Sequence, residues 1–438
     1  MKNINRRNFV KGSALATGFA LTNPLNAGIG AFGGGSDTLK LAVVGCGGRG
    51  TGAVSQALNA DEGVELVAMA DAFQDRLDSC YSTLSNIFDK KRLKVKDKNK
   101  FVGFGSYKQA IDEADVVILT TPPGFRPDHF AYAVEKGKHV FMEKPVATDA
   151  PGIRKVLEAA KVAKQKKLNV VVGLQRHYQP CYTEVHDRIQ KGEIGNIVSG
   201  QVYWNSSGVW VKEREAGQTE MEYQMRNWYY FNWLCGDHIL EQHIHNIDVA
   251  NWFIGAYPVS AQGMGGREVR KGKNHGQIFD HHFVEFVYPE GQVISSQCRH
   301  QPDTLSRVSE AFQTTKGTIY TDSGNKGIIK TYGGDELYNH DGSNDISPYQ
   351  IEHDELFKSI RSGGVIDNTE FGAKSTMTAI MGRMATYSGK LITWDEALAS
   401  NIRLVPDEMA MDWNSTPPVV PDENGNYPVP VPGVTKVI

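Results

Sequence analysis

The stretch from Leu39 to Gly52, LKLAVVGCGGRGTG, constrains the fold of this chain more than any other part of it. Its first residues are apolar and partly β-branched, which is typical of a buried parallel strand. Gly45, Gly47 and Gly50 follow at the spacing G-x-G-x-x-G. At that spacing the first glycine permits a tight turn, the second lets backbone approach a pyrophosphate, and the third lets the next helix pack closely. The stretch therefore predicts the strand, turn and helix of a dinucleotide site.

A second apolar segment, Val64 to Asp71, supports this interpretation because it ends in an acid. A carboxylate at that strand end accepts hydrogen bonds from the ribose hydroxyls of adenosine and repels a 2'-phosphate, so NAD is expected rather than NADP. Arg76 lies close enough in sequence to work against this preference. The cofactor contacts expected from the turn and the strand ends are Gly45, Gly47, Gly48, Arg49, Gly50, Asp71, Thr121, Pro122, His129, Glu143 and Lys144.

Charge and length limit the kind of partner. The 438 residues suit two or three domains, and the formal net charge is only −3. A nearly balanced charge gives no basic field for nucleic acid or for an anionic membrane surface. The expected partner is therefore a small molecule.

The N-terminus has the pattern of a targeting signal. Arg6 and Arg7 lie in NRRNFVK and precede a mildly apolar run, as in twin-arginine signals. That run is too short and too rich in Gly, Ala and Thr for a stable membrane span. Residues 1–37 are therefore predicted to be a signal and a flexible leader. We expect the protein to fold around a cofactor that it retains and then to be exported to the periplasm.

The cysteines indicate no redox or metal framework. The five residues are widely spaced, odd in number and without short paired spacings: Cys46, Cys80, Cys181, Cys235 and Cys298. We therefore expect neither a disulfide network nor a metal site made of cysteines.

A further strand, Lys138 to Met142, ends in Glu143-Lys144-Pro145. Lys144 is thus a cation at the carboxyl end of a parallel strand, where substrate and nicotinamide should meet. Together with the glycine turn, Asp71, the TTPP turn and His129, this EKP sequence resembles the Gfo/Idh/MocA family of nicotinamide-dependent sugar and cyclitol oxidoreductases over residues 38 to 395.

The resemblance implies an α/β plus α+β fold. A doubly wound parallel Rossmann sheet is expected in residues 38–174, and a largely antiparallel open sheet that covers the nicotinamide in residues 175–395. The tail, residues 396–438, holds seven of the eighteen prolines from Pro406 onward and should be extended. It could wrap onto a neighbouring subunit, and a homo-oligomer is expected.

A second organising stretch runs from Gly236 to Gly255 and predicts one helix with a charged, imidazole-rich face. The resemblance implies an acid four residues before a histidine, both joining Lys144 at the substrate. Glu241 and His245 occupy these positions, although the family's acid is usually aspartate. Oxidation of a secondary alcohol needs a base for the hydroxyl proton, which His245 suits. Lys144 would stabilise the alkoxide, and Glu241 would orient the imidazole or hold a neighbouring hydroxyl.

Metal binding is an alternative use of this helix. His238, Glu241 and His245 share a face and have residue types that can hold zinc. The resemblance implies no metal, so none is expected. His243 falls on the apolar side and is interpreted as a core histidine.

The segment from Val202 to Trp233 is irregular and aromatic, which suits the apolar faces of a sugar but equally a core or a subunit contact. The expected substrate contacts are Arg176, His177, Asn205, Arg226, Trp228, His238 and His300. Three functions stay open: an exported oxidoreductase acting on a sugar or polyol, a redox-neutral NAD-dependent enzyme that cleaves glycosides, and a non-catalytic sugar-binding protein.

Overall fold

Two β-sheets organise the chain in the computed structural model, which describes residues 38–406 and 411–438. The predicted targeting segment, residues 1–37, lies outside the described residues. The first sheet is parallel in the order β3-β2-β1-β4-β5-β6. Its strands are β1 (Leu39–Val44), β2 (Val64–Asp71), β3 (Lys100–Val102), β4 (Val116–Leu119), β5 (His139–Met142) and β6 (Val170–Val172). This order confirms the predicted doubly wound fold, with the switch point at β1.

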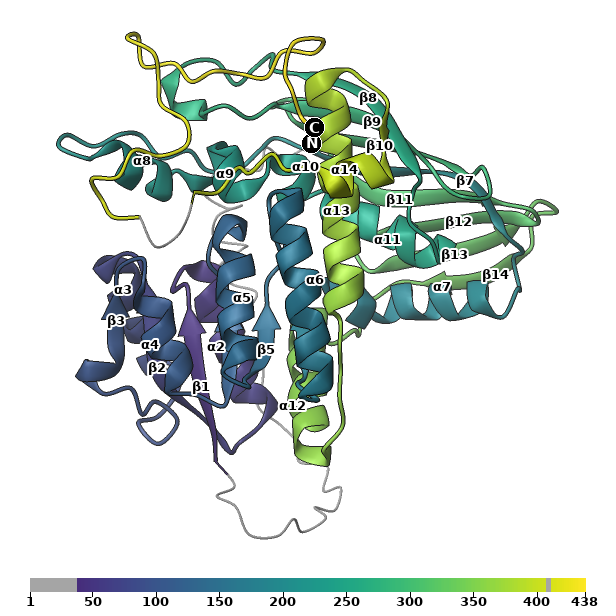
Figure 1. Ribbon diagram of the computed structural model, residues 1–438. Helices are drawn as coiled ribbons and strands as arrows, with labels where there is room; N and C mark the ends of the chain where they lie inside the picture. The colour runs from purple at the N-terminus through teal and green to yellow at the C-terminus, as the bar shows by residue number, and fades with distance from the viewer. Residues whose placement is uncertain (1–37, 407–410) are drawn as a thin grey trace, which may run out of the picture. The chain divides into compact units, whose positions relative to one another are not determined.

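Helices connect these strands and cover the sheet (Figure 1). They are α2 (Gly48–Ala60), α3 (Gln74–Ser85), α4 (Ser106–Asp112), α5 (Arg126–Glu135) and α6 (Ala150–Gln165). The strands are buried on both faces, since Leu41 and Val43 lie in one apolar cluster and Ala42 and Val44 in another. Burial on both faces explains the continuous apolar runs of the sequence.

The second sheet has the order β14-β13-β12-β11-β7-β10-β9-β8-β15. Only β7 and β10 pair in parallel; the other neighbours are antiparallel, which confirms a largely antiparallel second sheet. Its strands are β7 (Ile197–Ser206), β8 (Ser260–Gly266), β9 (His281–Val287), β10 (Val293–His300), β11 (Arg307–Thr314), β12 (Gly317–Asp322), β13 (Lys326–Thr331), β14 (Glu336–His340) and β15 (Ile392–Thr393). The remaining helices are α7 (Pro180–Gln190), α8 (Glu220–Arg226), α9 (Asn232–Cys235), α10 (His238–Glu241), α11 (Ile244–Ile254), α12 (Pro348–Ser362), α13 (Thr369–Ser388) and α14 (Trp394–Ala399).

The predicted single helix from Gly236 to Gly255 is wrong in its first half. Gly236 and Asp237 have left-handed φ values of 77° and 74°, so no helix begins there. α10 then ends at Glu241 and α11 begins at Ile244. Between them the amide of His243 donates to the carbonyl of His238, five residues back, which breaks the regular ladder.

Two late helices join the sheets. α12 packs against α2, and its Leu356 and Phe357 belong to the apolar cluster of the first sheet. α13 contacts both α6 of the first sheet and β8 of the second, and Figure 1 shows it between them. The division at residues 174 and 395 stays a prediction, because these helices give the two sheets a shared core.

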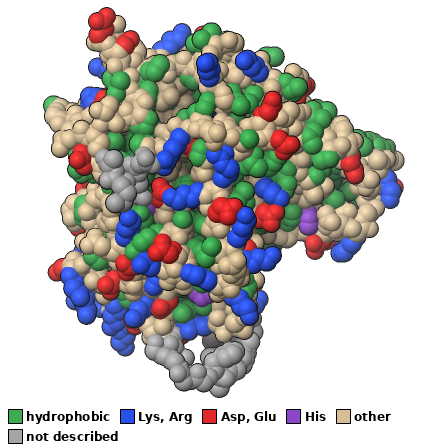
Figure 2. All heavy atoms as spheres, viewed as in Figure 1, with side chains coloured by type: hydrophobic (Ala, Val, Ile, Leu, Met, Phe, Trp, Pro, Cys, Tyr) green, Lys and Arg blue, Asp and Glu red, His purple; other side chains and the backbone are tan. Residues whose placement is uncertain are grey.

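The surface shows no field of one sign in the view of Figure 2, where basic and acidic side chains alternate. This agrees with the formal net charge of −3. Within residues 38–406 and 411–438, no helix combines the length and the apolarity that crossing a bilayer requires. All five cysteines lie buried as free thiols.

Candidate active site

The glycine turn after β1 can be formed only by glycine at two of its positions. Gly45 has a φ of +98°, and a Cβ there would lie 2.6 Å from the backbone nitrogen of Thr121. A Cβ on Gly50 would lie 2.0 Å from the carbonyl oxygen of Gly45. These contacts hold the start of α2 against the ends of β1 and β4, as the sequence predicts.

The other two glycines leave open space for a ligand. A Cβ on Gly47 or Gly48 would meet nothing within 4 Å. Gly48 is the first residue of α2, whose N-terminal amides face that space and favour an anion. The residues present therefore fit the pyrophosphate of a dinucleotide.

Gly47→Ala tests this fit. Gly47 has an extended conformation, φ −73° and ψ −174°, which alanine adopts, so the fold should tolerate the change. The added methyl group fills the space that a pyrophosphate needs, and we expect NAD affinity to fall about tenfold or more, measured by calorimetric titration. Gly105→Ala is the control, because a Cβ there also meets nothing within 4 Å but lies outside the turn. Equal affinity in both variants would contradict the assignment.

Asp71 lies where the ribose of adenosine is expected. Its Oδ2 accepts a hydrogen bond from the amide of Cys46 at 2.6 Å, and its Oδ1 accepts one from the amide of Phe73 at 2.9 Å. Burial raises the pKa of Asp71, whereas these two amides lower it. The two bonds fix the carboxylate at the edge of the cavity.

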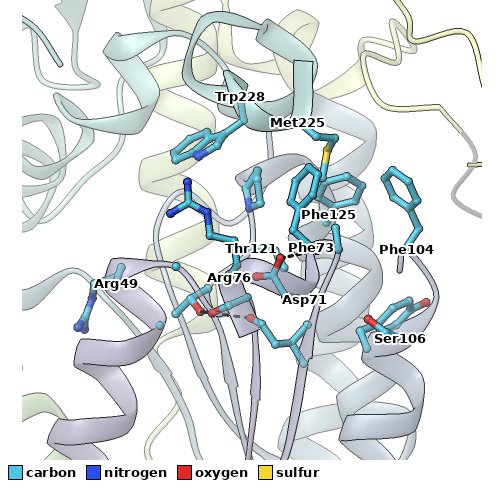
Figure 3. Close-up of a pocket in the computed structure, with 18 of the residues that line it drawn as sticks. Arg49, Asp71, Phe73, Arg76, Phe104, Ser106, Thr121, Phe125, Met225 and Trp228 are labelled. Carbon is cyan, nitrogen blue, oxygen red and sulfur yellow. Dashed lines mark hydrogen bonds between the residues drawn. The ribbon is translucent and has the colours of Figure 1, made fainter. Parts of the chain in front are cut away.

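The cavity itself has a volume of about 610 Å³. The nucleotide-binding half of its wall includes nine of the predicted cofactor residues: Gly45, Gly47, Gly48, Arg49, Gly50, Asp71, Thr121, Pro122 and His129. The facing wall comes from the second sheet's insertion between β7 and α9, which the sequence did not predict for the cofactor: Trp210, Lys212, Met225, Arg226 and Trp228. Figure 3 shows Trp228 over Arg76 on that side, and Met225 pointing toward Phe73 and Phe125.

Glu143 links the glycine turn to the lysine expected at the substrate. Its carboxylate pairs with the guanidinium of Arg49, which also reaches Glu352 of α12 at 3.2 Å. Burial raises the pKa of Glu352, and Arg49 lowers it. No sequence pattern points to Glu352, because it lies more than 200 residues from Glu143. This pair of contacts places Lys144, the next residue, beside the nucleotide turn.

Lys144 and Glu241 are in contact, as the resemblance implies. The Nζ of Lys144 donates to the backbone carbonyl of Glu241 at 2.5 Å and lies 3.4 Å from its Oε1. Burial raises the pKa of Glu241, and Lys144 lowers it. Glu241 therefore holds Lys144 and makes no hydrogen bond to His245, so its predicted role of orienting the imidazole finds no contact in the structure.

His245 lies near the same lysine. It is 5 % exposed and stacks on Trp204 with ring centroids 6.0 Å apart. Among the described residues its Nδ1 has no hydrogen-bond partner. Burial lowers the pKa of His245 well below its usual range, and the positive charges of Lys144 and Arg176 lower it further. The imidazole is therefore neutral near pH 7 and able to accept a proton.

Two predicted substrate residues contact buried carboxylates inside the protein and do not line the cavity. Arg176 pairs with Glu310, both almost fully buried. His177 lies 2.8 Å from Asp248 and stacks against Trp252. Sequence position suggested contact with substrate for both residues, but their carboxylate partners lie far along the chain and fix them between α11 and the second sheet.

The other predicted substrate residues separate into two groups. Arg226 and Trp228 line the cofactor cavity. His238 and His300 are 0 % and 2 % exposed, and Asn205 is 5 % exposed. The Nδ1 of His300 accepts from Arg270 at 2.5 Å, so its Nε2 donates to Gln242 at 2.7 Å. His300 is thus engaged on both sides.

The metal alternative required His238 beside Glu241 and His245. In the described part of the chain, the structure instead groups His238 with Asp237 and His282, whose ligand-type atoms lie within 4.8 Å of one another. Asp237 also accepts from the amide of Phe279 at 2.9 Å and from the hydroxyl of Tyr387 at 2.5 Å. This cluster therefore acts first as a buried hydrogen-bond network. His243 is also buried, with its Nε2 2.8 Å from Ser296, as expected of a core histidine.

The aromatic segment forms a core, and its contact with a sugar stays a prediction. Trp210 and Trp228 face the cavity. Most of the remaining rings join an apolar cluster with Phe125 and Tyr427: Tyr223, Tyr229, Tyr230, Phe231 and Trp233. The segment is therefore a core of its own that presents one edge to the cofactor cavity.

Buried neutral histidines make the fold sensitive to acid. Burial lowers the pKa of His238 to about 4, and that of His243 and His353 to about 3. Below pH 6.5 the unfolded chain binds protons at these rings that the folded chain does not, so acid favours unfolding. Each histidine should remove about 1.4 kcal/mol of stability per pH unit between pH 6.5 and its folded pKa.

We therefore expect the free energy of unfolding in urea to fall by about 2 to 4 kcal/mol between pH 6.5 and pH 5.5. His353→Gln should make this fall in the free energy of unfolding smaller by the contribution of one histidine. Equal free energies at the two pH values would show that these rings titrate in the folded state.

Family comparison agrees with this geometry. Residues 39–173 match the profile described as "Oxidoreductase family, NAD-binding Rossmann fold", and residues 182–320 match the Gfo/Idh/MocA C-terminal domain. The chain belongs to the Gfo/Idh/MocA family. The resemblance to this family that the glycine turn and the EKP sequence predicted is thereby confirmed.

Two of the curated relatives carry the name of an inositol dehydrogenase. Inositol 2-dehydrogenase of Salmonella paratyphi B is 31 % identical over 221 residues, which cover 50 % of this chain and 55 % of the relative. The scyllo-inositol 2-dehydrogenase (NAD(+)) of Bacillus subtilis is 29 % identical over 175 residues, 39 % of this chain and 41 % of the relative. The chain thus spans about half the length of the curated relatives it matches.

Solved structures share the fold. The aldose-aldose oxidoreductase of Caulobacter crescentus has a TM-score of 0.64 at 16 % identity, covering 81 % of this chain and 99 % of that one. A levoglucosan dehydrogenase in complex with NADH and levoglucosan has the same TM-score at 17 % identity, with the same coverage. At these identities the likeness shows the fold alone.

Proposed function

We propose that this protein is an NAD-dependent oxidoreductase that acts on a secondary hydroxyl of a sugar or polyol. The observation that carries the proposal is the contact of Lys144 with Glu241. A neutral His245 lies close to Lys144. Lys144 also follows Glu143, which pairs with Arg49 of the glycine turn. The names of the inositol dehydrogenase relatives and of the levoglucosan complex support a polyhydroxylated substrate.

A bound nicotinamide would take up the hydride of the carbinol carbon, which is the chemistry the cofactor supplies. The residues of this chain supply the proton transfer. His245 accepts the hydroxyl proton at a ring nitrogen, because burial and Lys144 keep the ring neutral. Lys144 donates a hydrogen bond to the oxygen as negative charge develops there, and Glu241 holds the ammonium group. Loss of one hydride and one proton converts the alcohol to a ketone.

Asp71 supports NAD as the cofactor rather than NADP. Both of its oxygens are bound by backbone amides, so the carboxylate cannot turn away from a 2'-phosphate. Arg76 lines the same cavity and lies exposed, so it offers the phosphate a weaker, screened attraction. Parallel titrations with NAD and NADP test this preference; tighter binding of NADP would reject it.

A substrate screen tests the function. Purified protein is mixed with cyclitols, monosaccharides and anhydrosugars, with and without added NAD, and reduced nicotinamide is followed by its near-ultraviolet absorbance. Reduction with at least one compound of these classes is expected. Absence of reduction with every compound, in protein that binds NAD, would reject the oxidoreductase proposal.

A redox-neutral glycosidase is the second candidate, favoured by the covered adenosine end of the cavity described below. In that reaction the carbinol carbon loses a hydride and the resulting ketone acidifies the neighbouring C–H. The glycosidic oxygen then leaves with a proton, water adds, and the hydride returns to the carbonyl, so the electrons balance. Cleavage of a glycoside without net nicotinamide reduction would identify this route.

Export by the twin-arginine route is also proposed, on the motif at Arg6 and Arg7. An exported enzyme has no supply of soluble NAD and would need a cofactor that stays bound. Fractionation of cells that express Arg6→Lys and Arg7→Lys together tests it: the wild-type chain should be periplasmic and the double variant should not. Equal distribution of both would reject the proposal.

A further inference from the structure

The adenosine end of the cofactor cavity is covered by parts of the chain that lie far from the glycine turn. Beyond Asp71 the wall is formed by Phe73 and Phe104, which follow β2 and β3. Trp413 of the C-terminal tail packs on both rings, with centroid distances of 4.8 Å to Phe73 and 4.7 Å to Phe104. An aromatic residue of the tail thus fixes the two loops that an adenine would have to pass.

A second contact closes the same place from α8. Arg226 donates two hydrogen bonds of 2.8 Å to the carboxylate of Asp75, in the first turn of α3. Its guanidinium also lies 3.7 Å from the ring centroid of Phe73. A bidentate pair of this kind fixes orientation as well as distance. Arg226 therefore connects the second sheet's insertion to the nucleotide-binding sheet directly across the cavity.

The tail is anchored on α8 at several points. Thr219 donates to the carbonyl of Trp413 at 2.6 Å, and Gln224 donates to the carbonyl of Val419 at 2.7 Å. The hydroxyl of Tyr427 donates to Glu220 at 2.5 Å. Figure 1 shows the tail passing over α8 and α9. Opening the adenosine end would therefore require the tail and α8 to move together.

We infer that Trp413 and the Arg226–Asp75 pair form an adenosine clamp, which slows the exchange of the bound dinucleotide with free nucleotide. The inference rests on the proposed function, because it presumes a dinucleotide in this cavity. It adds that residues of the second sheet and of the tail retain the cofactor. The clamp holds the loops around the site, and the nucleotide is released only when both contacts break.

Isotope exchange tests the clamp. Protein is purified, dialysed extensively and mixed with excess ¹³C-labelled NAD, and the unlabelled nucleotide that remains bound is measured by mass spectrometry over time. The wild type should keep its nucleotide through dialysis. Trp413→Ala and Asp75→Ala should each exchange it about tenfold faster or more. Asp75 has a 61 % exposed side chain, so its replacement does not disturb the core.

Val420→Ala is the matched control, because Val420 lies in the same tail and is 49 % exposed. It should exchange at the wild-type rate. Rapid exchange by the wild type, or wild-type rates in both clamp variants, would overturn the clamp and leave the oxidoreductase proposal standing. Protein that binds no dinucleotide at all would instead reject the proposed function.

Discussion

His245→Asn is expected to lower kcat by about 100-fold to 10,000-fold, the range that general acid–base catalysis contributes. Asparagine keeps the polarity and approximate size of the ring but cannot accept the hydroxyl proton at neutral pH. Steady-state kinetics with the substrate identified by the screen give the value. Since His245 does not line the cofactor cavity, the content of bound nucleotide should stay unchanged.

The same residue sets the pH profile. Burial and Lys144 lower the pKa of His245, so it stays deprotonated on acidification past the usual histidine value. The acid limb of kcat/KM in the wild type should therefore lie below pH 6.5 and be absent from the variant. His340→Asn is the control, because His340 lies on the outer strand β14, where its Nε2 lies 2.8 Å from Asp345. Wild-type kcat in His245→Asn would remove the histidine from the mechanism.

Lys144→Met is expected to lower kcat by about 100-fold to 1,000-fold, as does loss of one donor to a developing oxyanion. Methionine preserves the length and packing of the side chain but removes the charge. Because Glu241 loses its cation, its pKa should rise further. A fall in kcat without a comparable rise in KM would show that the lysine acts in the transition state.

Lys161→Met provides the comparison for this variant. Lys161 has a 66 % exposed side chain and pairs with Glu158 on the surface of α6. It should keep wild-type kcat, since surface pairs contribute little. If Lys144→Met also kept the wild-type kcat, the ammonium group of Lys144 would have no part in the reaction.

The nucleotide half of the site could be predicted from the sequence because its constraints are local. Gly45 and Gly50 each have a backbone reason to be glycine within a few residues of a recognisable strand. Asp71 ends a strand whose apolar pattern is evident. Parallel strands place their carboxyl ends at one edge, so Lys144 could be assigned to that edge as well.

The remainder depends on contacts between distant residues. β8, with the sequence SAQGMGG, has the composition of a turn and becomes a strand only by pairing with β9 and β15. The break between α10 and α11 depends on the backbone at Gln242 and His243, where the amide of His243 donates to the carbonyl of His238. The clamp residues Trp413 and Asp75 lie more than 300 residues apart, and a single sequence gives no signal that they share one site.

The internal position of Arg176 also depends on a contact between residues far apart in the sequence. Near the crossing into the second sheet, a cation suggests contact with substrate. Its partner Glu310, on β11, also accepts from Tyr182 at 2.9 Å and from Thr321 at 2.6 Å. A carboxylate with so many donors is a structural centre, which only the folded arrangement reveals.

Transfer of deuterium from substrate to nucleotide tests whether hydride transfer takes place at this site. A polyol that is active in the screen is prepared with deuterium on the carbinol carbon, reacted in a single turnover, and the nucleotide released by denaturation is analysed by mass spectrometry. We expect one deuterium on the nicotinamide ring of the wild type and almost none in His245→Asn over the same time. Ketone formation with no deuterium in the nucleotide would contradict hydride transfer at this site.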